Sequence, residues 1–529
     1  MHSPMQALPV LNVSGHEAST SHLQIQMSPA ATTAEPLNAR PVGQIESYST
    51  SRHNLGFYRC VGQTARYTVP RTSLKDTSLE SAVEHAVAQT ILAHSILQVG
   101  IVGEETRTPH FVYLPAINLS QLLSWEHFQL ETPADRDSVL QRVLETRHST
   151  SWPDISRRPG YHFIVLCPDV GTALPTETLT VDIVFAYHHG YGDGPSGTIL
   201  HRTLLRALNS PGSVPSFDPS SHVRTISTPP PLPPPQEALI DFRISWPYFI
   251  KALWTEFAPS FLKPAPPAPA WTGKPITPYP DNTRIRLLSF STHTLSDMLQ
   301  RCREHCTTLT PLLHILVLYS LAKRLPDTEN YDGGFTSVSP ISLRRLLPHG
   351  GLKGFNSDES MGVFLVGQSH RFAPQTIRRI RTLAEGQSAA EDLIWELASS
   401  LGEEIKRKVA SLPNDDVVGL MSYVSDWNER WRKLIGKSRE STWEVSNVGA
   451  TDFEKKGPWT VDRLVFSQSG HVAGAAVSIS AAGVKGSELA ITLCWQEDII
   501  SEELANGLAE DLMKCLTALA RTGRFGVVV

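Results

Sequence analysis

The sequence contains few cysteines, no long hydrophobic run and no excess of charge of one sign. Six cysteines are scattered unevenly over 529 residues, so we expect no disulfide framework and infer a reducing compartment. No stretch approaches the roughly twenty apolar residues that span a bilayer, and the N-terminus lacks the basic and apolar segments of a secretion signal. We therefore expect a cytoplasmic protein, or one held peripherally on the endoplasmic reticulum or another lipid surface.

The charge is not concentrated in a basic stripe or an acidic tail, and its net value is only −5. Because nucleic-acid binding needs clustered lysine and arginine, we expect no nucleic-acid partner. A hydrophobic fraction of 41% with 19% charged residues is typical of a globular chain rather than a disordered or fibrous one. A chain of 529 residues is too long for one ordinary core, which favours two domains or one two-lobed body.

Composition divides the chain into four parts. Residues 1–40 are rich in Ser, Thr, Ala and Pro without apolar periodicity, which predicts a mobile leader. Two proline-dense stretches lie within 210–283, and proline excludes helix and central strand there. They enclose an aromatic, amphipathic segment at 238–257. This segment is predicted to form either a helix packed on the body or a surface that contacts lipid or the entrance for substrate. The parts at 41–209 and 284–529 are predicted to form two structured lobes.

Each lobe combines helices with strands that do not alternate regularly. A capping box of Thr77 and Glu80 predicts the start of an amphipathic helix, and Thr310 is the expected N-cap of a second helix. Apolar, β-branched runs at 161–167 and 179–187 predict two strands. This irregular order predicts an α/β fold with mostly non-parallel sheets rather than a doubly wound fold.

The strand at 179–187 runs into the segment AYHHGYGDGPSG. Its end matches the glycine fingerprint of a dinucleotide site, but no second strand with an acidic residue follows within about thirty residues. A nucleophilic serine elbow would need one more residue between Ser196 and Gly197. His188 and His189 are adjacent at a strand end and point to opposite faces, so they do not readily reach one metal ion. We therefore predict no metal site here.

General-base catalysis is the remaining chemical interpretation of this segment. The strand end presents His189 at the rim of a sheet, and Asp193 can brace the loop. Room for two substrates is expected around the glycines Gly190, Gly192 and Gly194. An imidazole with an ordinary pKa of about 6.5 can take the proton of a substrate hydroxyl and pass it to a thiolate leaving group. The local residues leave open a structural alternative, in which the histidines only cap the strand.

The residues from His188 to Gly194 fit the H-H-x-x-x-D-G pattern of the CoA-dependent acyltransferase superfamily. That superfamily includes chloramphenicol acetyltransferase, the plant BAHD acyltransferases and the condensation domains of peptide synthetases. The stretch SRHNLGFYRCVGQTARYTVP resembles the opening of the fungal alcohol O-acetyltransferase family. Three later stretches, SPISLRRLLP, MGVFLVG and STWEVSNVGA, resemble further blocks of that family in the same order. The resemblance spans roughly residues 45–525.

This resemblance implies two chloramphenicol-acetyltransferase-like lobes, each a mixed, largely antiparallel sheet with flanking helices. A tunnel between the lobes would admit the acyl-CoA from one side and the alcohol from the other. The protein would be an O-acyltransferase that moves an acetyl or other acyl group from acyl-CoA to the hydroxyl of an alcohol or secondary metabolite. Acetyl-CoA or another acyl-CoA would be a co-substrate, with no permanently bound cofactor, and the enzyme would act as a monomer.

The resemblance also assigns roles to residues. The second histidine of the motif is the catalytic one, so His189 would be the general base, with His188 in support. The motif aspartate, Asp193, would be structural and would pair with an arginine of the other lobe. The candidates for that arginine are Arg344 and Arg345. The candidates for a donor to the tetrahedral oxyanion near the tunnel are Ser446 and Asn447.

Two alternatives to this function remain at the level of the sequence. A condensation-like enzyme would take its acyl group from a carrier-protein thioester instead of CoA. A binding module could retain the same fold with an inactive site.

Overall fold

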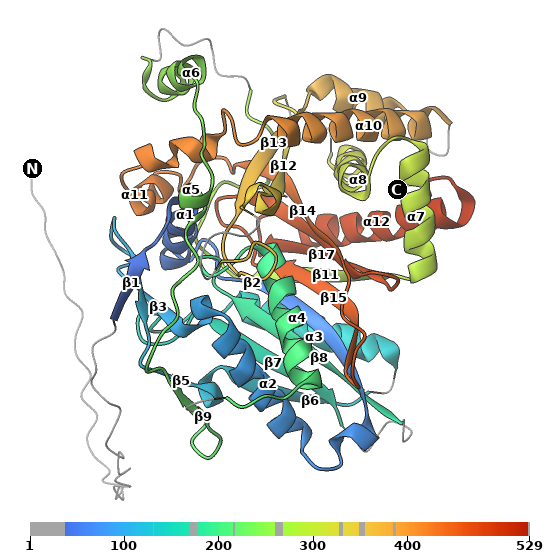
Figure 1. The fold of residues 1–529 in the computed structure, drawn as a ribbon. Coiled ribbons are helices and arrows are strands. Elements are labelled where there is room, and N and C mark those ends of the chain that lie inside the picture. The colour runs from blue at the N-terminus through green and yellow to red at the C-terminus, as the bar shows by residue number, and fades with distance from the viewer. Residues whose placement is uncertain are drawn as a thin grey trace, which may run out of the picture. The chain divides into compact units, whose positions relative to one another are not determined.

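Two large sheets and their flanking helices make up most of the protein in the computed structural model (Figure 1). The structure describes residues 37–130, 132–169, 177–214, 217–259, 268–326, 332–348, 355–383 and 388–526. The end of the expected leader belongs to the fold, because Leu37–Pro41 forms strand β1 and pairs with β4 (His110–Tyr113). The rest of that leader lies outside the described residues. All six cysteines are free.

The first lobe contains a five-stranded sheet in the order β15-β2-β8-β7-β6. Its strands are β2 (Val61–Pro70), β6 (Leu123–Phe128), β7 (Tyr161–Pro168), β8 (Thr178–Tyr187) and β15 (Thr460–Gln468). All neighbours are antiparallel except β6 and β7. Strands β7 and β8 confirm the two apolar runs recognised in the sequence.

Side chains alternate between the two faces of β8. Ile183 and Phe185 join the core that contains helices α2 (Leu79–Ala93) and α4 (Gly194–Asn209). Val184, between them, joins a cluster with helix α3 (Pro133–His148) and strands of the second lobe. This two-residue period is the geometry of a strand buried on both faces. It explains why the run from 179 to 187 is continuously apolar.

The second lobe contains a six-stranded sheet in the order β11-β17-β16-β14-β12-β13. Its strands are β11 (Thr283–Phe290), β12 (Phe335–Ser342), β13 (Leu365–Phe372), β14 (Ser441–Thr451), β16 (Ala475–Val484) and β17 (Leu489–Gln496). Strand β14 runs parallel to both of its neighbours, and the remaining pairs are antiparallel. The expected α/β class with mixed, largely antiparallel sheets is therefore confirmed.

Helices pack on this second sheet around one core. They are α7 (Thr292–Glu304), α8 (Leu309–Arg324), α9 (Pro374–Thr382), α10 (Ser388–Ser411) and α12 (Glu502–Thr522). Helix α8 is buried on nearly all sides, as a helix that is apolar all round must be. Among the described helices, no single helix is long and apolar enough to cross a membrane. Helices α7 and α8 have the necessary length and hydropathy only when taken together, and they are bent by 91° relative to each other.

The two sheets do not divide at the expected boundary of residue 284. Strand β15 lies late in the chain, yet it pairs antiparallel with β2 and completes the sheet of the first lobe. Cys494 and Ile285 of the second lobe pack with Leu140 and Ile164 of the first in a shared cluster. The C-terminal part of the chain therefore contributes to both lobes.

In two helices the observed N-cap residue lies one or two positions away from the predicted one. The N-cap of α2 is Ser78, whose side chain accepts from the backbone of Ser81, and not Thr77. Helix α8 begins at Leu309 after Thr308, so Thr310 lies inside it. In both cases neighbouring Ser and Thr residues offer competing caps, and composition does not decide which hydroxyl faces the helix end.

The connection at 210–283 is more structured than its proline content predicted. Strand β10 (Val223–Thr225) is the middle of a small sheet with β5 (Ala116–Asn118) and β9 (Phe217–Asp218). These short strands fall between the prolines, where backbone donors are available. The aromatic segment forms α5 (Gln236–Leu239) and α6 (Trp246–Phe257).

Candidate active site

The motif segment joins the end of β8 to the start of α4. His188 and His189 follow Tyr187, the last residue of the strand, and Asp193 is the N-cap of α4. The Asp193 side chain accepts from the backbone N–H of Ser196 at 3.0 Å, which satisfies a donor that the first helical turn leaves free. The Tyr187 hydroxyl donates to the Asp193 carbonyl at 2.6 Å. Strand, loop and helix are thus tied into one rigid corner.

The Asp193 carboxylate is fully occupied by protein donors. Its Oδ1 accepts from Arg344 Nη2 at 2.9 Å and from the Ser196 hydroxyl at 2.7 Å. Its Oδ2 accepts from the backbone N–H of Phe364 at 3.1 Å. Asp193 is 1% exposed, so a substrate has no access to these oxygens. The other candidate partner, Arg345, is directed elsewhere and donates to the carbonyl of Val409.

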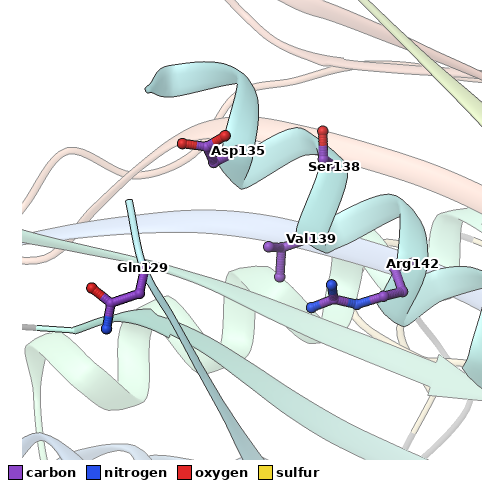
Figure 2. Close-up of a pocket in the computed structure, with 5 residues that line it drawn as sticks. All are labelled: Gln129, Asp135, Ser138, Val139 and Arg142. Carbon is purple, nitrogen blue, oxygen red and sulfur yellow. The ribbon is translucent and has the colours of Figure 1, made fainter. Parts of the chain in front are cut away.

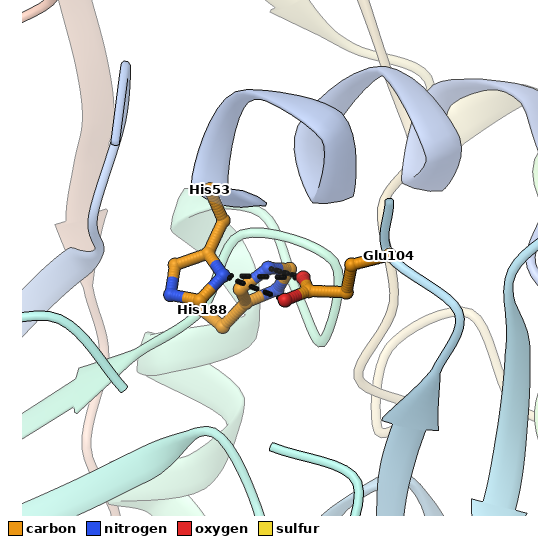
Figure 3. Close-up of side chains that lie close together, drawn as sticks. All are labelled: His53, Glu104 and His188. Carbon is orange, nitrogen blue, oxygen red and sulfur yellow. Dashed lines mark hydrogen bonds and ion pairs between the residues drawn. The ribbon is translucent and has the colours of Figure 1, made fainter. Parts of the chain in front are cut away.

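His188 is directed toward Glu104, which follows strand β3 (Val99–Val102) (Figure 3). Its Nδ1 accepts from the backbone N–H of Gly190 at 2.9 Å, and its Nε2 lies 3.2 Å from the Glu104 carboxylate. The same carboxylate lies 3.0 Å from Nδ1 of His53, on helix α1 (Gln44–Asn54). Glu104 therefore links α1 to the motif.

Burial determines the ionisation of this cluster. Desolvation lowers the pKa of His188 to about 4, so its ring is neutral at neutral pH. Burial alone would raise the pKa of Glu104, but hydrogen bonds from His188 and His53 lower it to about 2. Glu104 is thus an ionised, buried acceptor between two histidines.

The donor atoms of His53, Glu104 and His188 lie within 4.8 Å of one another, which is near enough to share a metal ion. Their hydrogen bonds give a different account. Because Gly190 donates to Nδ1 of His188, the ring proton resides on Nε2 and faces Glu104. A metal ion at Nε2 would require that proton to leave. The observed contacts therefore fit a positioning cluster.

His189 is half-buried, with its ring 5.6 Å from that of Tyr58 between centroids. Its buried Nδ1 makes no hydrogen bond within the described residues. A proton on Nδ1 leaves the lone pair on Nε2. Desolvation, followed by the positive charge of Arg52, lowers the pKa of His189 to about 4. The ring is neutral at pH 7 and can accept a proton.

The three motif glycines make room for neighbouring protein atoms, and the clearance for substrates that the sequence suggests stays a prediction. A Cβ on Gly190 would lie 2.9 Å from the His188 ring, and one on Gly192 would lie 2.6 Å from Ser196. A Cβ on Gly194 would lie 2.7 Å from Val448 of β14. The glycines therefore permit the close packing of the motif on itself and on the second lobe.

The two residues expected near the oxyanion lie on β14, just before Val448. The Asn447 amide donates to Thr310 at 3.1 Å and accepts from the backbone of Gly449 at 2.8 Å. Its side chain is therefore committed to the second lobe. Ser446 is half-buried, and within the described residues its hydroxyl makes no hydrogen bond. Ser446 is the freer of the two candidates.

A surface pocket on α3 lies outside this constellation. It is lined by Gln129, Asp135, Ser138, Val139 and Arg142 (Figure 2). None of these residues belongs to the motif or to the clusters around it. The pocket therefore has no part in the chemistry considered below.

The whole arrangement is similar to solved two-lobed acyltransferases and condensation domains. The trichothecene 15-O-acetyltransferase TRI3 from Fusarium sporotrichioides aligns with a TM-score of 0.66 over 91% of this chain and 94% of its own, at 13% identity. The first condensation domain of the CDA synthetase aligns with a TM-score of 0.55 over 94% and 100%, at 16% identity. The fold is that of the CoA-dependent acyltransferase and condensation-domain class.

Sequence comparison identifies the family within this class. Residues 132–519 match the alcohol acetyltransferase family. A probable alcohol acetyltransferase, FCK4 of Fusarium pseudograminearum, is 32% identical over 92% of this chain and 96% of its own. The probable alcohol acetyltransferase crmB of Aspergillus fumigatus is 25% identical over 89% and 98%. The chain belongs to the alcohol acetyltransferase family and is an enzyme that transfers an acyl group to a hydroxyl, which confirms the expected fold and function.

Sequence reasoning missed several residues around the motif. Glu104 stands in a short turn without any local pattern that marks it. His53 and Arg52 fall within the stretch SRHNLGFY, whose resemblance to the family was recognised but whose residues had no assigned role. His471, in the loop before β16, also has its ring 4.6 Å from that of Tyr58. Only long-range folding brings these residues together.

Proposed function

We propose that this enzyme transfers the acetyl group of acetyl-CoA directly to an alcohol, with His189 as the general base. Nε2 of His189 takes the proton of the acceptor hydroxyl, and the alkoxide oxygen forms a bond to the thioester carbonyl carbon. The tetrahedral intermediate collapses, the carbon–sulfur bond breaks, and the CoA thiolate takes the proton from the imidazolium. The acceptor is a small alcohol or a hydroxyl of a secondary metabolite.

One observation carries this proposal. His189 is neutral and half-buried, whereas His188 is buried beside Glu104 and the carboxylate of Asp193 is held by protein donors. A base must be deprotonated and within reach of its substrate before it can act. Of the motif residues, His189 alone meets both conditions.

The test is thiol release from acetyl-CoA and longer acyl-CoAs, with and without a panel of alcohols. We expect alcohol-dependent release, and a loss of about 10²- to 10⁴-fold in turnover for His189→Ala. His162→Ala is the matched control, because this half-buried histidine of β7 also has its pKa lowered to about 4. Near-full activity in folded His189→Ala would refute the base assignment.

The same assay separates the alternative functions. Release without any alcohol would indicate a thioesterase. If none of the acyl-CoAs releases thiol, the result would favour a condensation-like enzyme with a carrier-protein donor, or an inactive binding module. We also propose that the enzyme is cytoplasmic and acts as a monomer. Asp193 and Arg344, the two partners of the motif brace, come from one chain, so the brace needs no second copy.

We also propose that α6 contacts a lipid surface. Trp246, Ile250, Leu253 and Trp254 recur at helical spacing and are 42–76% exposed. Lys251, also exposed, adds a positive charge to the same helix. Tryptophan and aliphatic residues beside a basic residue are typical of helices that lie in a membrane interface. Peripheral contact of this kind would bring an apolar acceptor near the enzyme.

A further inference from the structure

Arg52 on helix α1 is a buried cation that has no hydrogen-bonding partner among the described residues. The residue is 7% exposed, and its Nε is buried with no acceptor. Within the described residues its guanidinium makes no hydrogen bond and no ion pair. It stacks instead on two rings, with Cζ 4.3 Å from the centroid of Tyr48 and 4.8 Å from that of Tyr58.

This state is unusual for a buried arginine. Buried charges are normally paired or hydrogen-bonded, because desolvation of an unpaired ion is strongly unfavourable. Arg439, for comparison, is 4% exposed and donates to the carbonyl of Lys274 and to the side chain of Gln496. Stacking on aromatic rings stabilises a cation only modestly and does not replace several hydrogen bonds. The site therefore lacks an acceptor that a ligand can supply.

The guanidinium and the His189 ring lie against the same aromatic side chain. Tyr58 contacts both groups, since its ring centroid is 4.8 Å from Cζ of Arg52 and 5.6 Å from the His189 ring. Further polar atoms around them are also buried without partners: Nδ1 of His189, Nε2 of His471 and Oγ1 of Thr50. Buried polar groups are satisfied in most native structures. A cluster of orphaned ones beside His189 marks the place where a polar ligand binds.

Two carboxyl groups also face Arg52, but neither pairs with it. Glu440 is accessible to water and Glu444 is half-buried, yet desolvation raises the pKa of both, that of Glu444 to about 7. Glu444 accepts from Gln468 at 3.0 Å. Among the described residues, the charge of Arg52 acts on the titratable groups of Tyr48, Tyr58, His188, His189, His471, Glu440 and Glu444.

We propose that Arg52 is a catalytic residue whose guanidinium donates to the oxyanion of the tetrahedral intermediate. This inference rests on the proposed acyl transfer. When the alkoxide bonds to the carbonyl carbon, the π-electron pair moves onto the carbonyl oxygen and a full negative charge appears there. When the carbon–sulfur bond breaks, that pair returns and the charge leaves with the thiolate. Arg52 donates a hydrogen bond in this step and exchanges no proton.

A donor that is unpaired in the resting enzyme suits this role. It gains its partner only when charge develops, so it stabilises the transition state more than the ground state. Asn447, one of the oxyanion donors expected from the sequence, is committed to Thr310 and Gly449. A carboxylate group on the acceptor alcohol could also accept hydrogen bonds from Arg52. That carboxylate would be bound before the reaction begins, so loss of Arg52 would raise the KM of the acceptor and leave kcat unchanged.

The test compares Arg52→Gln and Arg52→Lys with Arg147→Gln. Arg147 is the matched control, because it too is buried and stacked, with Cζ 3.6 Å from the centroid of Trp152, and it lies outside the site. With acetyl-CoA and the best alcohol, we expect Arg52→Gln to lower kcat by about 10²- to 10³-fold, with little change in either KM. Arg52→Lys keeps the charge and should recover about tenfold of that loss. Arg147→Gln should keep kcat within about twofold of wild type.

A second readout does not depend on turnover. The charge of Arg52 lowers the pKa of His189, so Arg52→Gln should raise that pKa in an NMR titration of the resting protein, and Arg147→Gln should not.

A folded Arg52→Gln with kcat within about threefold of wild type would overturn the proposal, and a rise confined to the alcohol KM would assign Arg52 to an anionic acceptor. An unmoved His189 titration would refute the juxtaposition itself. No acyl transfer by the wild type would instead refute the proposed function.

Discussion

Nη2 of Arg344 lies 2.9 Å from Oδ1 of Asp193, across 151 residues of sequence. The same guanidinium donates to the carbonyls of Ser357 and Ser360 at 2.9 and 2.8 Å. One arginine therefore ties the motif loop of the first lobe to a segment of the second. The position of His189, four residues before Asp193, depends on both lobes.

Replacement of Asp193 by Asn should lower both stability and activity. The change leaves the guanidinium of Arg344, whose side chain is 12% exposed, without its carboxylate. Loss of one partner from a buried pair typically destabilises by about 3–5 kcal/mol. We expect reduced stability in urea unfolding and a parallel loss of kcat. Arg345→Ala, which breaks only a contact to a backbone carbonyl, should leave kcat unchanged. Equal stability of Asp193→Asn and wild type would contradict the brace.

Glu104 should act on catalysis through His188. Glu104→Gln keeps the shape of the side chain but removes the charge that holds the rings of His188 and His53. A misplaced loop should lower kcat by about ten- to a hundredfold. The control is Glu105→Gln, because that neighbour is exposed. Unchanged kinetics in Glu104→Gln would show that His188 is held by Gly190 alone.

The ionisation of Glu104 also predicts a pH effect on stability. Its pKa is about 2 in the folded protein and about 4.3 in an unfolded chain. A depressed carboxyl pKa stabilises the fold above the unfolded value, and this contribution is lost as the pH falls from about 4.3 toward 2. The difference in unfolding free energy between wild type and Glu104→Gln should therefore shrink on acidification below about pH 4. Urea unfolding at about pH 7 and about pH 3 measures this difference.

The rate should remain high at a lower pH than an ordinary histidine base would allow. The pKa of His189 is lowered to about 4, so the ring stays deprotonated until the pH falls to that range. The acid limb of kcat/KM should lie well below pH 6.5, the ordinary value for histidine. Brief assays followed by return to pH 7 exclude acid denaturation as the cause. A limb near pH 6.5 would show that His189 is solvated as in free peptides.

The sequence predicted the parts of the site that are local. His189, Asp193 and the strand before them lie within a few residues, and the strand period and the motif both mark them. Arg344 was one of two candidates, since the sequence does not tell which of two adjacent arginines turns toward the other lobe. Glu104, Arg52 and His471 were not predicted, because they stand in α1 and in two loops. Their proximity follows from sheet topology and not from spacing.

The exposed face of α6 should bind lipid without taking part in catalysis. We expect the wild type to sediment with vesicles that contain anionic phospholipid, and Trp246→Ser/Trp254→Ser to lose about tenfold or more in affinity, because two large apolar side chains leave the interface. Tyr279→Ser removes an aromatic residue that is 75% exposed elsewhere and should bind like the wild type. Turnover of a water-soluble alcohol should be equal in all three proteins. Wild type that stays in the supernatant with every vesicle composition would refute the lipid contact, and α6 would then need a protein partner.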